Sequence, residues 1–375
     1  MLTNTEHIRY SRHLLLKGFG EAAQLKLKAS KVLVIGAGGL GSPLLMYLAA
    51  AGIGTICVMD DDIVQESNLQ RQVIFNTDDI DSSKATTAAS KLIALNPFID
   101  IHSYPQKLTA ENALETFEKF DVIADGSDNF PTRYLVNDAA VLSNKPVVYG
   151  SVFRFEGQVS VFNYTDEEGT TGPNYRDLFP VPPPPESVPD CSVAGVLGVL
   201  PGIIGSMQAL EVIKVITGVG EVLSGKLFHF DGLSMQSHMF TLKRRVDNPL
   251  NGEHPVISTL IDYESFCNPG ASVKEITPEE FKVMKANGEK FELVDVREPA
   301  EYEQINIGGR LIPLGQVMDH AQLFDTNTKI IFHCKSGARS ANAIRQLQDK
   351  YHFTNLFNLK GGLDDSPPAK EGKAS

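Results

Sequence analysis

Residues 333–340 read HCKSGARS and place a cysteine, a glycine and an arginine in one short stretch. The apolar run before it, residues 329–332, predicts a strand that ends where this stretch begins. A cysteine sulfur held among backbone N–H groups beside a cation is a nucleophile. Taken alone, the stretch is compatible with a phosphatase, a redox thiol or a sulfurtransferase, so the rest of the chain must decide what Cys334 attacks.

A second chemical motif lies near the amino end. The sequence GAGGLG gives Gly36, Gly38 and Gly41 in G-x-G-x-x-G order, between an apolar strand-like run and a helical stretch. Glycines let the backbone approach a phosphate, and the start of a helix favours negative charge. Asp60 ends the next apolar run, where a carboxylate can bind ribose hydroxyls. The motif predicts nucleotide binding, and an NAD-dependent dehydrogenase is its first interpretation.

The residues after that second run favour ATP over a nicotinamide. The stretch DDDIVQESNLQRQ and a lysine beyond it supply cations and amides suited to a triphosphate. Further on, DGSDN follows another apolar run and offers a carboxylate that can hold the Mg²⁺ accompanying ATP. Each residue alone is more often a cap or a turn former. Together they predict an ATP site that includes Asp60, Asp62, Asn68, Arg71, Gln72, Lys84, Asp128 and Asn129.

These motifs must be positioned by an α/β fold. Strand-like, helical and strand-like patterns follow one another within residues 31–60, which predicts a parallel, Rossmann-like sheet. Alternating apolar residues within 145–164 predict antiparallel strands after it. A stretch rich in Gly, Pro and acidic residues, 165–190, predicts a loop, and a glycine-rich apolar helix follows.

Composition limits the class of protein. With 375 residues, the chain is long enough for two or three domains. Its 46 acidic and 34 basic side chains give a net charge of −12, which argues against a nucleic-acid partner. The amino end lacks a signal pattern and no apolar run is long enough for a membrane span, so we expect a cytoplasmic protein with no membrane partner. The widely separated cysteines predict neither a disulfide framework nor a cysteine zinc site.

Seven stretches in order resemble the ThiF/MoeB/HesA adenylyltransferases, relatives of the ubiquitin-activating enzymes. They include RYSRHLLLKGFG, VLVIGAGGLGSP, DGSDNFPTRYLVND and GVLGVLPGIIGSMQALEVIKVITG, and the resemblance covers residues 5–245. It implies a homodimer that binds ATP and Mg²⁺ and adenylates the C-terminal Gly-Gly carboxylate of a ubiquitin-like sulfur-carrier protein. By position, it implies that phosphates lie at Gly38, Gly39 and Gly41, ribose at Asp60, the triphosphate at Asn68, Arg71 and Lys84, Mg²⁺ at Asp128, and the neighbouring subunit's ATP site at Arg12.

The resemblance also bears on the other cysteines. Cys191 lies where the proline-rich loop meets the glycine-rich helix, and the start of a helix stabilises a thiolate. In relatives a cysteine here is conjugated to, or exchanges sulfur with, the activated carrier, so we expect a sulfur-handling role for Cys191. Cys57 lies inside an apolar strand and is expected to be core packing, and Cys267 is expected to have no chemical role.

Many members of the family bind a structural zinc through two C-x-x-C pairs, and this chain departs from that pattern. Asn174 and Asp177 stand at the first pair, and Asn248 and Asn251 stand at the second. Asparagine amides are poor zinc ligands beside thiolates, so we predict no zinc. Hydrogen bonds among turn-forming residues are expected to replace the metal.

From residue 273 onward the chain resembles a rhodanese-like domain over nearly the whole length of that domain. FELVDVRE carries Asp295 and Arg297 on a predicted strand, whereas residues 306–309 depart from the usual histidine-alanine-glycine-alanine stretch. The tryptophan usual after the GGL turn is also absent.

On this fold, the spacing in the cysteine loop separates two chemistries. A phosphatase loop needs one residue more between cysteine and arginine than the four found here, so the spacing favours the tighter cradle of a sulfurtransferase. Such a cradle would hold a persulfide by backbone N–H groups, with the helix dipole and Arg339 lowering the thiol pKa. The predicted persulfide loop consists of Cys334, Lys335, Ser336, Gly337, Ala338, Arg339 and Ser340.

Together the resemblances predict an adenylation domain at 1–246, a linker at 247–272 and a rhodanese-like domain at 273–375. A persulfide on Cys334 would attack the acyl adenylate, directly or through Cys191, to give a thiocarboxylate. The sulfur, supplied by a cysteine desulfurase or thiosulfate, would go to molybdopterin, thiamin, tRNA or cysteine synthesis.

Three alternatives to this function stay open. The chain could be an adenylyltransferase whose rhodanese-like unit only docks partners, or a nucleotide-binding scaffold without catalysis. An NAD-linked oxidoreductase is the third.

Overall fold

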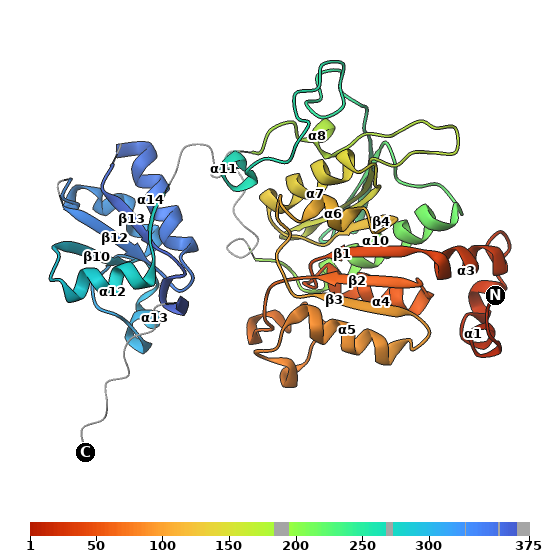
Figure 1. Cartoon of the computed structure of the whole chain (residues 1–375), viewed down its shortest axis with the longest axis horizontal. Helices are drawn as coiled ribbons and strands as arrows, with labels where there is room; N and C mark the ends of the chain where they lie inside the picture. Colours follow the sequence, from red (N-terminus) through yellow and green to blue (C-terminus); the bar gives the residue numbers. More distant parts are fainter. Residues whose placement is uncertain (184–194, 268–272, 327, 352, 366–375) are drawn as a thin grey trace. The chain divides into compact units, whose positions relative to one another are not determined.

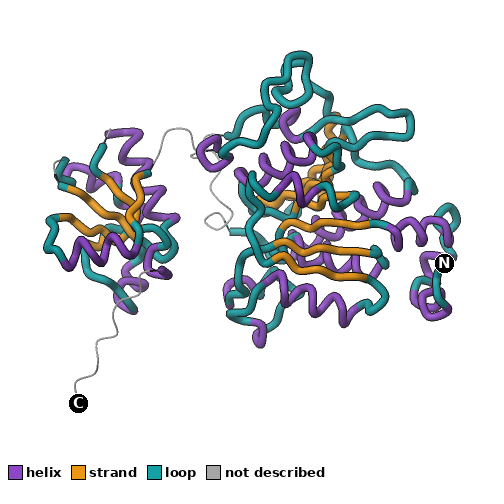
Figure 2. Tube along the Cα trace, in the orientation of Figure 1, coloured by secondary structure: helices purple, strands orange, loops and turns teal. Residues whose placement is uncertain are grey.

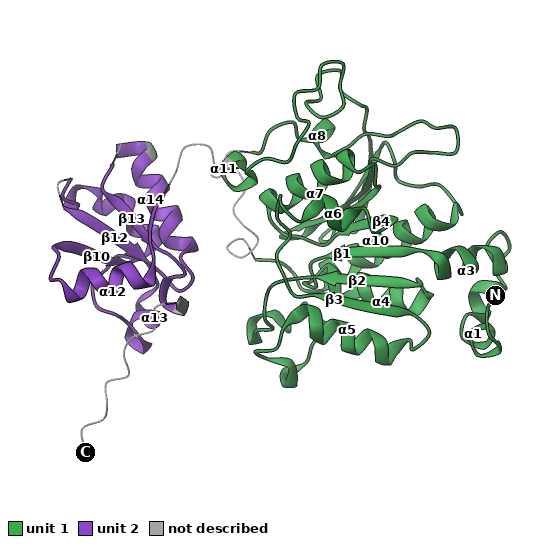
Figure 3. Ribbon diagram, viewed as in Figure 1, with its two compact units in different colours: residues 1–267 green, residues 268–375 purple. Residues whose placement is uncertain are grey.

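The computed structural model describes residues 1–183, 195–267, 273–326, 328–351 and 353–365 (Figure 1). They belong to two compact units, residues 1–267 and 268–375 (Figure 3). Both units are of the α/β class, as predicted, and Figure 2 shows strands layered with helices in each.

The first unit is built on an eight-stranded sheet with the order β3-β2-β1-β4-β5-β6-β7-β8. The pairs from β3 to β5 are parallel, as predicted for a Rossmann-like sheet, and the pairs from β5 to β8 are antiparallel. The strands are β1 Lys31–Ile35, β2 Thr55–Met59, β3 Asp100–Tyr104, β4 Val122–Asp125, β5 Val147–Phe153, β6 Glu156–Phe162, β7 Lys226–Asp231 and β8 Gln236–Thr241.

Helices cover both faces of the parallel part of this sheet (Figure 1). Within β1, Val32 and Val34 pack with residues of α4, α5 and α10, while Leu33 and Ile35 pack with residues of α6 and α7. A central strand buried on both faces explains why its sequence is continuously apolar. The helices are α1 Asn4–Arg9, α2 Ser11–Leu14, α3 Gly20–Ala29, α4 Gly41–Ala51, α5 Lys84–Leu95, α6 Ala113–Phe117, α7 Phe130–Leu142, α8 Tyr175–Leu178, α10 Val199–Thr217 and α11 Tyr263–Cys267, with short 3-10 turns η1 Glu66–Asn68 and η2 Thr77–Asp79.

Helix α10 is the glycine-rich apolar helix of the sequence. By length and composition it could cross a membrane. In the structure it packs against α4 and against strands β5 and β6, so its apolar side chains serve the core of the first unit.

The second unit has a five-stranded parallel sheet with the order β11-β10-β12-β13-β9. Cys334 follows the last residue of β12 directly, and α14 begins at Ala338, so the cysteine loop joins a central strand to a helix. The elements are β9 Lys274–Ile276, α12 Pro278–Ala286, β10 Phe291–Asp295, α13 Pro299–Gln304, β11 Arg310–Leu311, η3 Leu314–Gln316, η4 Met318–Leu323, β12 Lys329–His333, α14 Ala338–Tyr351, β13 Leu356–Leu359 and α15 Gly362–Asp365.

The structure differs from the sequence prediction in the segment expected to be a linker, residues 247–272. Up to Cys267 this segment belongs to the first unit. Tyr263 is 5% exposed and its hydroxyl donates to Asp138 Oδ2 at 2.9 Å. The Phe266 ring lies edge-on to Tyr134. A few aromatic side chains thus anchor a stretch whose overall pattern is too polar to predict packing.

Candidate functional site

The glycine motif forms the turn between β1 and α4. Gly36 has a φ of +89°, a conformation that only glycine adopts without strain. A Cβ on Gly41 would lie 2.0 Å from the Gly36 carbonyl oxygen, so no larger residue fits there. At Gly38 a Cβ would meet only Gln72 Nε2, at 3.7 Å. The start of α4 at Gly38 therefore has room for a ligand, and phosphate binding there stays a prediction.

Asp60 lies at the end of β2 and contacts this turn. Its Oδ2 accepts a hydrogen bond from the Ala37 N–H at 2.7 Å, and its Oδ1 accepts one from the Asp62 N–H at 2.9 Å. Burial raises the pKa of Asp60, although both hydrogen bonds oppose that shift. The backbone thus fixes the carboxylate beside the glycine turn, where ribose binding is predicted.

Lys84, the first residue of α5, is held near the same edge of the sheet. Its Nζ donates to Asp62 Oδ2 at 2.8 Å. The Lys84 side chain is 7% exposed, whereas that of Asp62 is 70% exposed. A buried ammonium whose hydrogen-bonded carboxylate is exposed can exchange that carboxylate for an incoming phosphate.

The turn after β2 brings Arg71 and Gln72 to the glycine motif. Arg71 Cγ would lie 3.4 Å from a Cβ on Gly39, and its Nη1 donates to the Ser67 carbonyl at 3.0 Å. Gln72 is 3% exposed, and among the described residues its Oε1 has no hydrogen-bond partner. The unpartnered oxygen is a hydrogen-bond acceptor, so a donating group of a ligand, such as a ribose hydroxyl, could complete it, whereas a phosphate could not. Asn68 is also buried here, with its Oδ1 accepting from the Gln65 N–H.

Two residues predicted to bind ATP follow the end of β4, and the structure gives them different surroundings. Asp128 is exposed, so its carboxylate is free to meet a metal ion. Asn129 instead caps α7, because its side-chain oxygen accepts from the Thr132 N–H at 2.9 Å. Asp125, which the sequence prediction omitted, is fully buried two residues before Ser127, and burial raises its pKa.

Arg12 is the one predicted nucleotide residue that lies on the amino-terminal helices. It is exposed on α2, a helix that packs against α1 and α3. This placement does not bring Arg12 together with the glycine turn of its own chain. A role for it in a neighbouring subunit's site stays a prediction.

In the second unit, Cys334 lies at the base of the cysteine loop and is 0% exposed. The Gly337 N–H donates to its Sγ at 3.2 Å, and Ser340 Oγ lies 3.6 Å from the same sulfur. Ser340 Oγ is also 2.7 Å from Asn358 Oδ1, on β13. Gly337 has a φ of +88°, which turns its N–H toward the sulfur. Lys335, Ser336 and Ala338 form the exposed rim of the loop.

Arg339 does not stand free beside the sulfur. Its Nη1 and Nη2 each donate to Glu301 of α13 at 2.7 Å. This bidentate pair lowers the pKa of Glu301 to about 2 and raises the pKa of Arg339, which interaction with Cys334 raises further. The sequence prediction missed Glu301 because no local signal connects it with Arg339, which lies 38 residues further along the chain.

A buried ion pair supports the strand beside the loop. Arg297 and Asp295 are joined at 2.7 Å, and Arg297 Nη2 also donates to the Ile305 carbonyl at 2.7 Å. His333 is fully buried with its Nε2 3.7 Å from Asp295, and burial lowers its pKa. These contacts fix β10 and β12, and therefore the point from which Cys334 projects.

The four positions that replace the zinc cysteines come together in the first unit. Asn248 Nδ2 donates to Asp177 Oδ1 at 2.7 Å and lies 3.3 Å from Asn174 Oδ1. Asn174 Nδ2 donates to Asn251 Oδ1 at 3.1 Å. Asn174 and Asn248 are almost fully buried, so these bonds are shielded from water.

Of the remaining cysteines, the structure describes Cys57 and Cys267, which are both buried. Burial raises the pKa of Cys57 to about 12, as expected for a packed strand residue, and it raises the pKa of Cys267 to about 12 as well. Neither thiol is poised for nucleophilic attack. Cys191 lies outside the described residues, so its sulfur-handling role stays a prediction.

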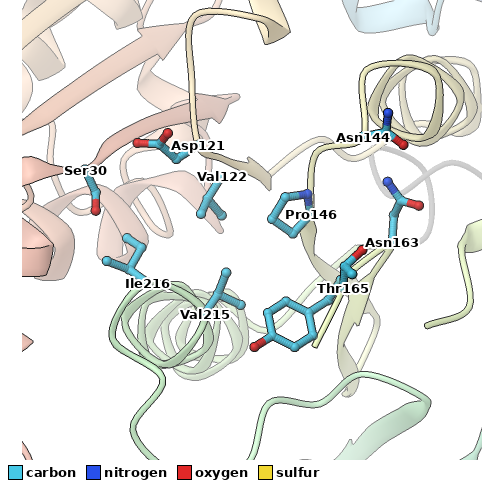
Figure 4. A pocket seen from close by; sticks show the side chains of 10 residues that line it. Ser30, Asp121, Val122, Asn144, Pro146, Asn163, Thr165, Val215 and Ile216 are labelled. Carbon is cyan, nitrogen blue, oxygen red and sulfur yellow. The ribbon is translucent and has the colours of Figure 1, made fainter. Parts of the chain in front are cut away.

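Two pockets mark the first unit. One, of about 330 Å³, is lined by residues including Ser30 and Asp121 on one side and Asn163 on the other (Figure 4). It lies where β1 and β4 begin, whereas the glycine turn lies where β1 ends. The other, of about 530 Å³, lies between Arg71 and apolar residues of α10, next to the nucleotide residues.

Comparisons with known proteins agree with both halves of this geometry. Residues 10–250 match the ThiF family and residues 277–365 match the rhodanese-like domain. A Mycobacterium tuberculosis protein named "Probable adenylyltransferase/sulfurtransferase MoeZ" is 44% identical over 373 residues, covering 96% of this chain and 93% of that protein. The sulfur carrier protein adenylyltransferase of Thermus thermophilus is 48% identical over 265 residues, which is 71% of this chain and 98% of that protein.

A solved structure shows the same fold for the first unit. Escherichia coli MccB, crystallised with MccA-N7isoASN, has a TM-score of 0.58 and 23% identity, and the match covers 66% of this chain and 75% of that one. Fold, site geometry and relatives thus define an adenylyltransferase fused to a sulfurtransferase. The chain belongs to the ThiF family and carries a C-terminal rhodanese-like domain, and its nucleotide site binds ATP.

Proposed function

We propose that this chain adenylates the C-terminal glycine of a ubiquitin-like sulfur-carrier protein ending in Gly-Gly and converts it to a thiocarboxylate with sulfur from Cys334. The observation that carries the proposal is the presence in one chain of an open glycine turn lined by cations and of a cysteine whose sulfur accepts hydrogen bonds from the Gly337 N–H and the Ser340 hydroxyl. The 48% identity to the sulfur carrier protein adenylyltransferase of Thermus thermophilus supports a sulfur carrier as the partner.

In the first step, an oxygen of the carrier's carboxylate attacks the α-phosphorus of ATP, and pyrophosphate leaves. Two anions meet in this step, so Arg71 and Lys84 would stabilise the charge that accumulates in the transition state. Mg²⁺ held by the exposed Asp128 would neutralise further charge on the phosphates. No general base is needed because the carboxylate is already ionised.

In the second step, the terminal sulfur of a Cys334 persulfide attacks the acyl carbon, and AMP leaves. The product is an acyl disulfide between the carrier and Cys334. A thiol, either Cys191 or one from a cellular reductant, then attacks the Cys334 sulfur and releases the carrier thiocarboxylate. The resulting disulfide on the enzyme is returned to thiols by two electrons from that reductant. A cysteine desulfurase is the proposed source of the next persulfide.

We also propose that the active form is a cytoplasmic homodimer. Val73, Val199 and Leu210 line the 530 Å³ pocket and are each more than half exposed, which a second copy of the chain would cover. Arg12 would then reach the partner's ATP site. Sedimentation of the purified chain tests this, and a monomer at micromolar concentration would contradict it.

The amide cluster supports a first unit without zinc. Asn174, Asp177, Asn248 and Asn251 already satisfy one another through hydrogen bonds, and amide oxygens compete poorly for zinc. Metal analysis of the purified protein should give well below one equivalent of zinc, and one full equivalent would overturn this part of the proposal.

The test of the function is exchange of labelled pyrophosphate into ATP with each candidate carrier from the same genome. We expect exchange only with a carrier that ends in Gly-Gly, and loss of exchange when its last glycine is deleted. Exchange that proceeds in the absence of any carrier would sink the proposal, because it would mean that the enzyme adenylates a different substrate.

A further inference from the structure

The ion pair between Arg339 and Glu301 alters the charge of the cysteine loop in a way that the sulfur-transfer steps do not require. Both guanidinium Nη atoms are engaged by one carboxylate, at 2.7 Å each. Both side chains are 34% exposed, so solvent and small solutes can reach the pair. The cation that was expected to serve the sulfur is therefore shared between Cys334 and a carboxylate, which offsets much of its charge.

Glu301 is fixed in this position by its own helix. Its Oε2 also accepts a hydrogen bond from the Glu298 N–H at 3.1 Å, which caps the start of α13. Its carbonyl accepts from Arg297 Nη1 at 3.3 Å, and Arg297 is in turn held by the buried Asp295. The carboxylate is thus part of a built arrangement and is not a surface acid that happens to lie near an arginine.

This arrangement has a consequence for sulfur donors. An oxyanion such as thiosulfate is recognised by a free guanidinium fork, through the same two parallel hydrogen bonds that Glu301 now accepts. A dianion approaching the buried Cys334 would have to displace Glu301 or lie beside its negative charge. A cysteine persulfide carries at most one negative charge and needs no such fork.

We propose that Glu301 determines donor specificity: by occupying Arg339 it disfavours thiosulfate-type dianions and favours a donor that presents sulfur as a cysteine persulfide. The inference rests on the proposed sulfur transfer at Cys334. With either donor the step balances, since the Cys334 thiolate attacks the outer sulfur and forms an S–S bond. Sulfite leaves from thiosulfate, and a thiolate leaves from a persulfide.

The experiment uses the full chain and compares the wild type with Glu301→Gln, which keeps the shape of the side chain and removes its charge. Loading of Cys334 is followed with thiosulfate and, separately, with cysteine persulfide. We expect kcat/KM for thiosulfate to rise about tenfold, mainly through KM, and to fall again with added salt. With cysteine persulfide we expect a change of less than about twofold.

Glu303→Gln is the matched control, because Glu303 is an exposed acid on the same helix. It should leave the ratio of the two donors unchanged. Adding Arg339→Gln to Glu301→Gln should abolish the gain with thiosulfate, because the freed fork is then absent.

Two results would overturn the inference. One is an equal loss with both donors in Glu301→Gln, which would mean that the pair only supports the loop. The other is an unchanged donor ratio in a variant that loads normally. Failure of the proposed sulfur transfer at Cys334 would look different, since the wild type would then accept sulfur from neither donor.

Discussion

The nucleotide edge of the first unit and the cysteine loop of the second occupy the same topological place. Each lies where a central parallel strand, β1 or β12, turns into the start of a helix. They differ in how their polar groups are satisfied. Around Gly38 the space is open and the buried Lys84 pairs with the largely exposed Asp62, whereas Cys334 is buried and both Nη atoms of Arg339 are held by Glu301.

This difference reflects the charge of what each place must hold. A triphosphate brings several negative charges, so an edge that binds it gains from incompletely neutralised donors. A single sulfur needs only a few N–H and O–H groups at short range, and excess positive charge there would attract competing anions. The same architecture thus serves an open electrostatic site and a closed, prearranged one.

The largest expected effect comes from a substitution that stops sulfur transfer at the cysteine loop and leaves adenylation at the nucleotide edge intact. Cys334→Ser should abolish thiocarboxylate formation while leaving carrier-dependent exchange of pyrophosphate into ATP unchanged. Mass spectrometry of the carrier measures the first and isotope exchange measures the second. An unchanged thiocarboxylate yield would mean that the second unit is a docking module. The same assay on Cys191→Ser shows whether Cys191 or a thiol of the reductant releases the thiocarboxylate from Cys334.

The reciprocal change acts on the first unit. Lys84→Ala should lower the rate of pyrophosphate exchange by about 10²-fold to 10³-fold, because a buried cation is lost from the phosphate site. Persulfide loading of Cys334 should be unaffected. Lys91→Ala is the matched control on α5, since Lys91 pairs with Asp79 and not with the residues around the glycine turn. Equal losses in both variants would point to damage to α5 instead of catalysis.

A smaller effect tests whether the buried hydrogen bonds next to Cys334 contribute to persulfide transfer. Ser340→Ala removes the hydroxyl that lies between Cys334 and Asn358, and should slow persulfide transfer about tenfold. Asn358→Ala should have a similar effect, and the double variant should be little worse than either single one. Additive losses would show that the two side chains act separately.

The smallest effect concerns stability and pH. The pKa of Glu301 is lowered from 4.5 to about 2, so its pairing stabilises the fold above pH 4.5 and that contribution is lost as pH falls toward 2. The advantage of the wild type over Glu301→Gln in urea unfolding should be flat from neutral pH to about pH 5, below about 1 kcal/mol, and should shrink under more acidic conditions. An advantage that grows with acid would contradict this assignment.

The parts of the sites that are contiguous in sequence could be predicted. The glycine turn and the cysteine loop each fit in a few residues between a strand and a helix, so their patterns carry their geometry. The pairing of the four amide and carboxylate positions was also expected, because their spacing matched a known pattern.

Contacts between distant segments could not be predicted in the same way. Glu301 and Asn358 reach the cysteine loop only through the sheet order, which places β10 and β13 on either side of β12. Asn129 was assigned to ATP, but its amide caps α7, a use that sequence alone does not distinguish from ligand binding. The segment ending at Cys267 lacks the regular apolar pattern that usually reveals packing.

That last segment has a consequence for the distance over which sulfur must travel. Because α11 is anchored through Tyr263 to the buried pair of Asp138 and Arg176, the first unit extends to Cys267. From there to Lys274 the backbone spans at most about 25 Å, even when fully extended. Because both units belong to one covalent chain, the proposed sulfur transfer from Cys334 to the adenylate can be intramolecular. Dilution of the protein would then leave the rate of this sulfur transfer unaffected.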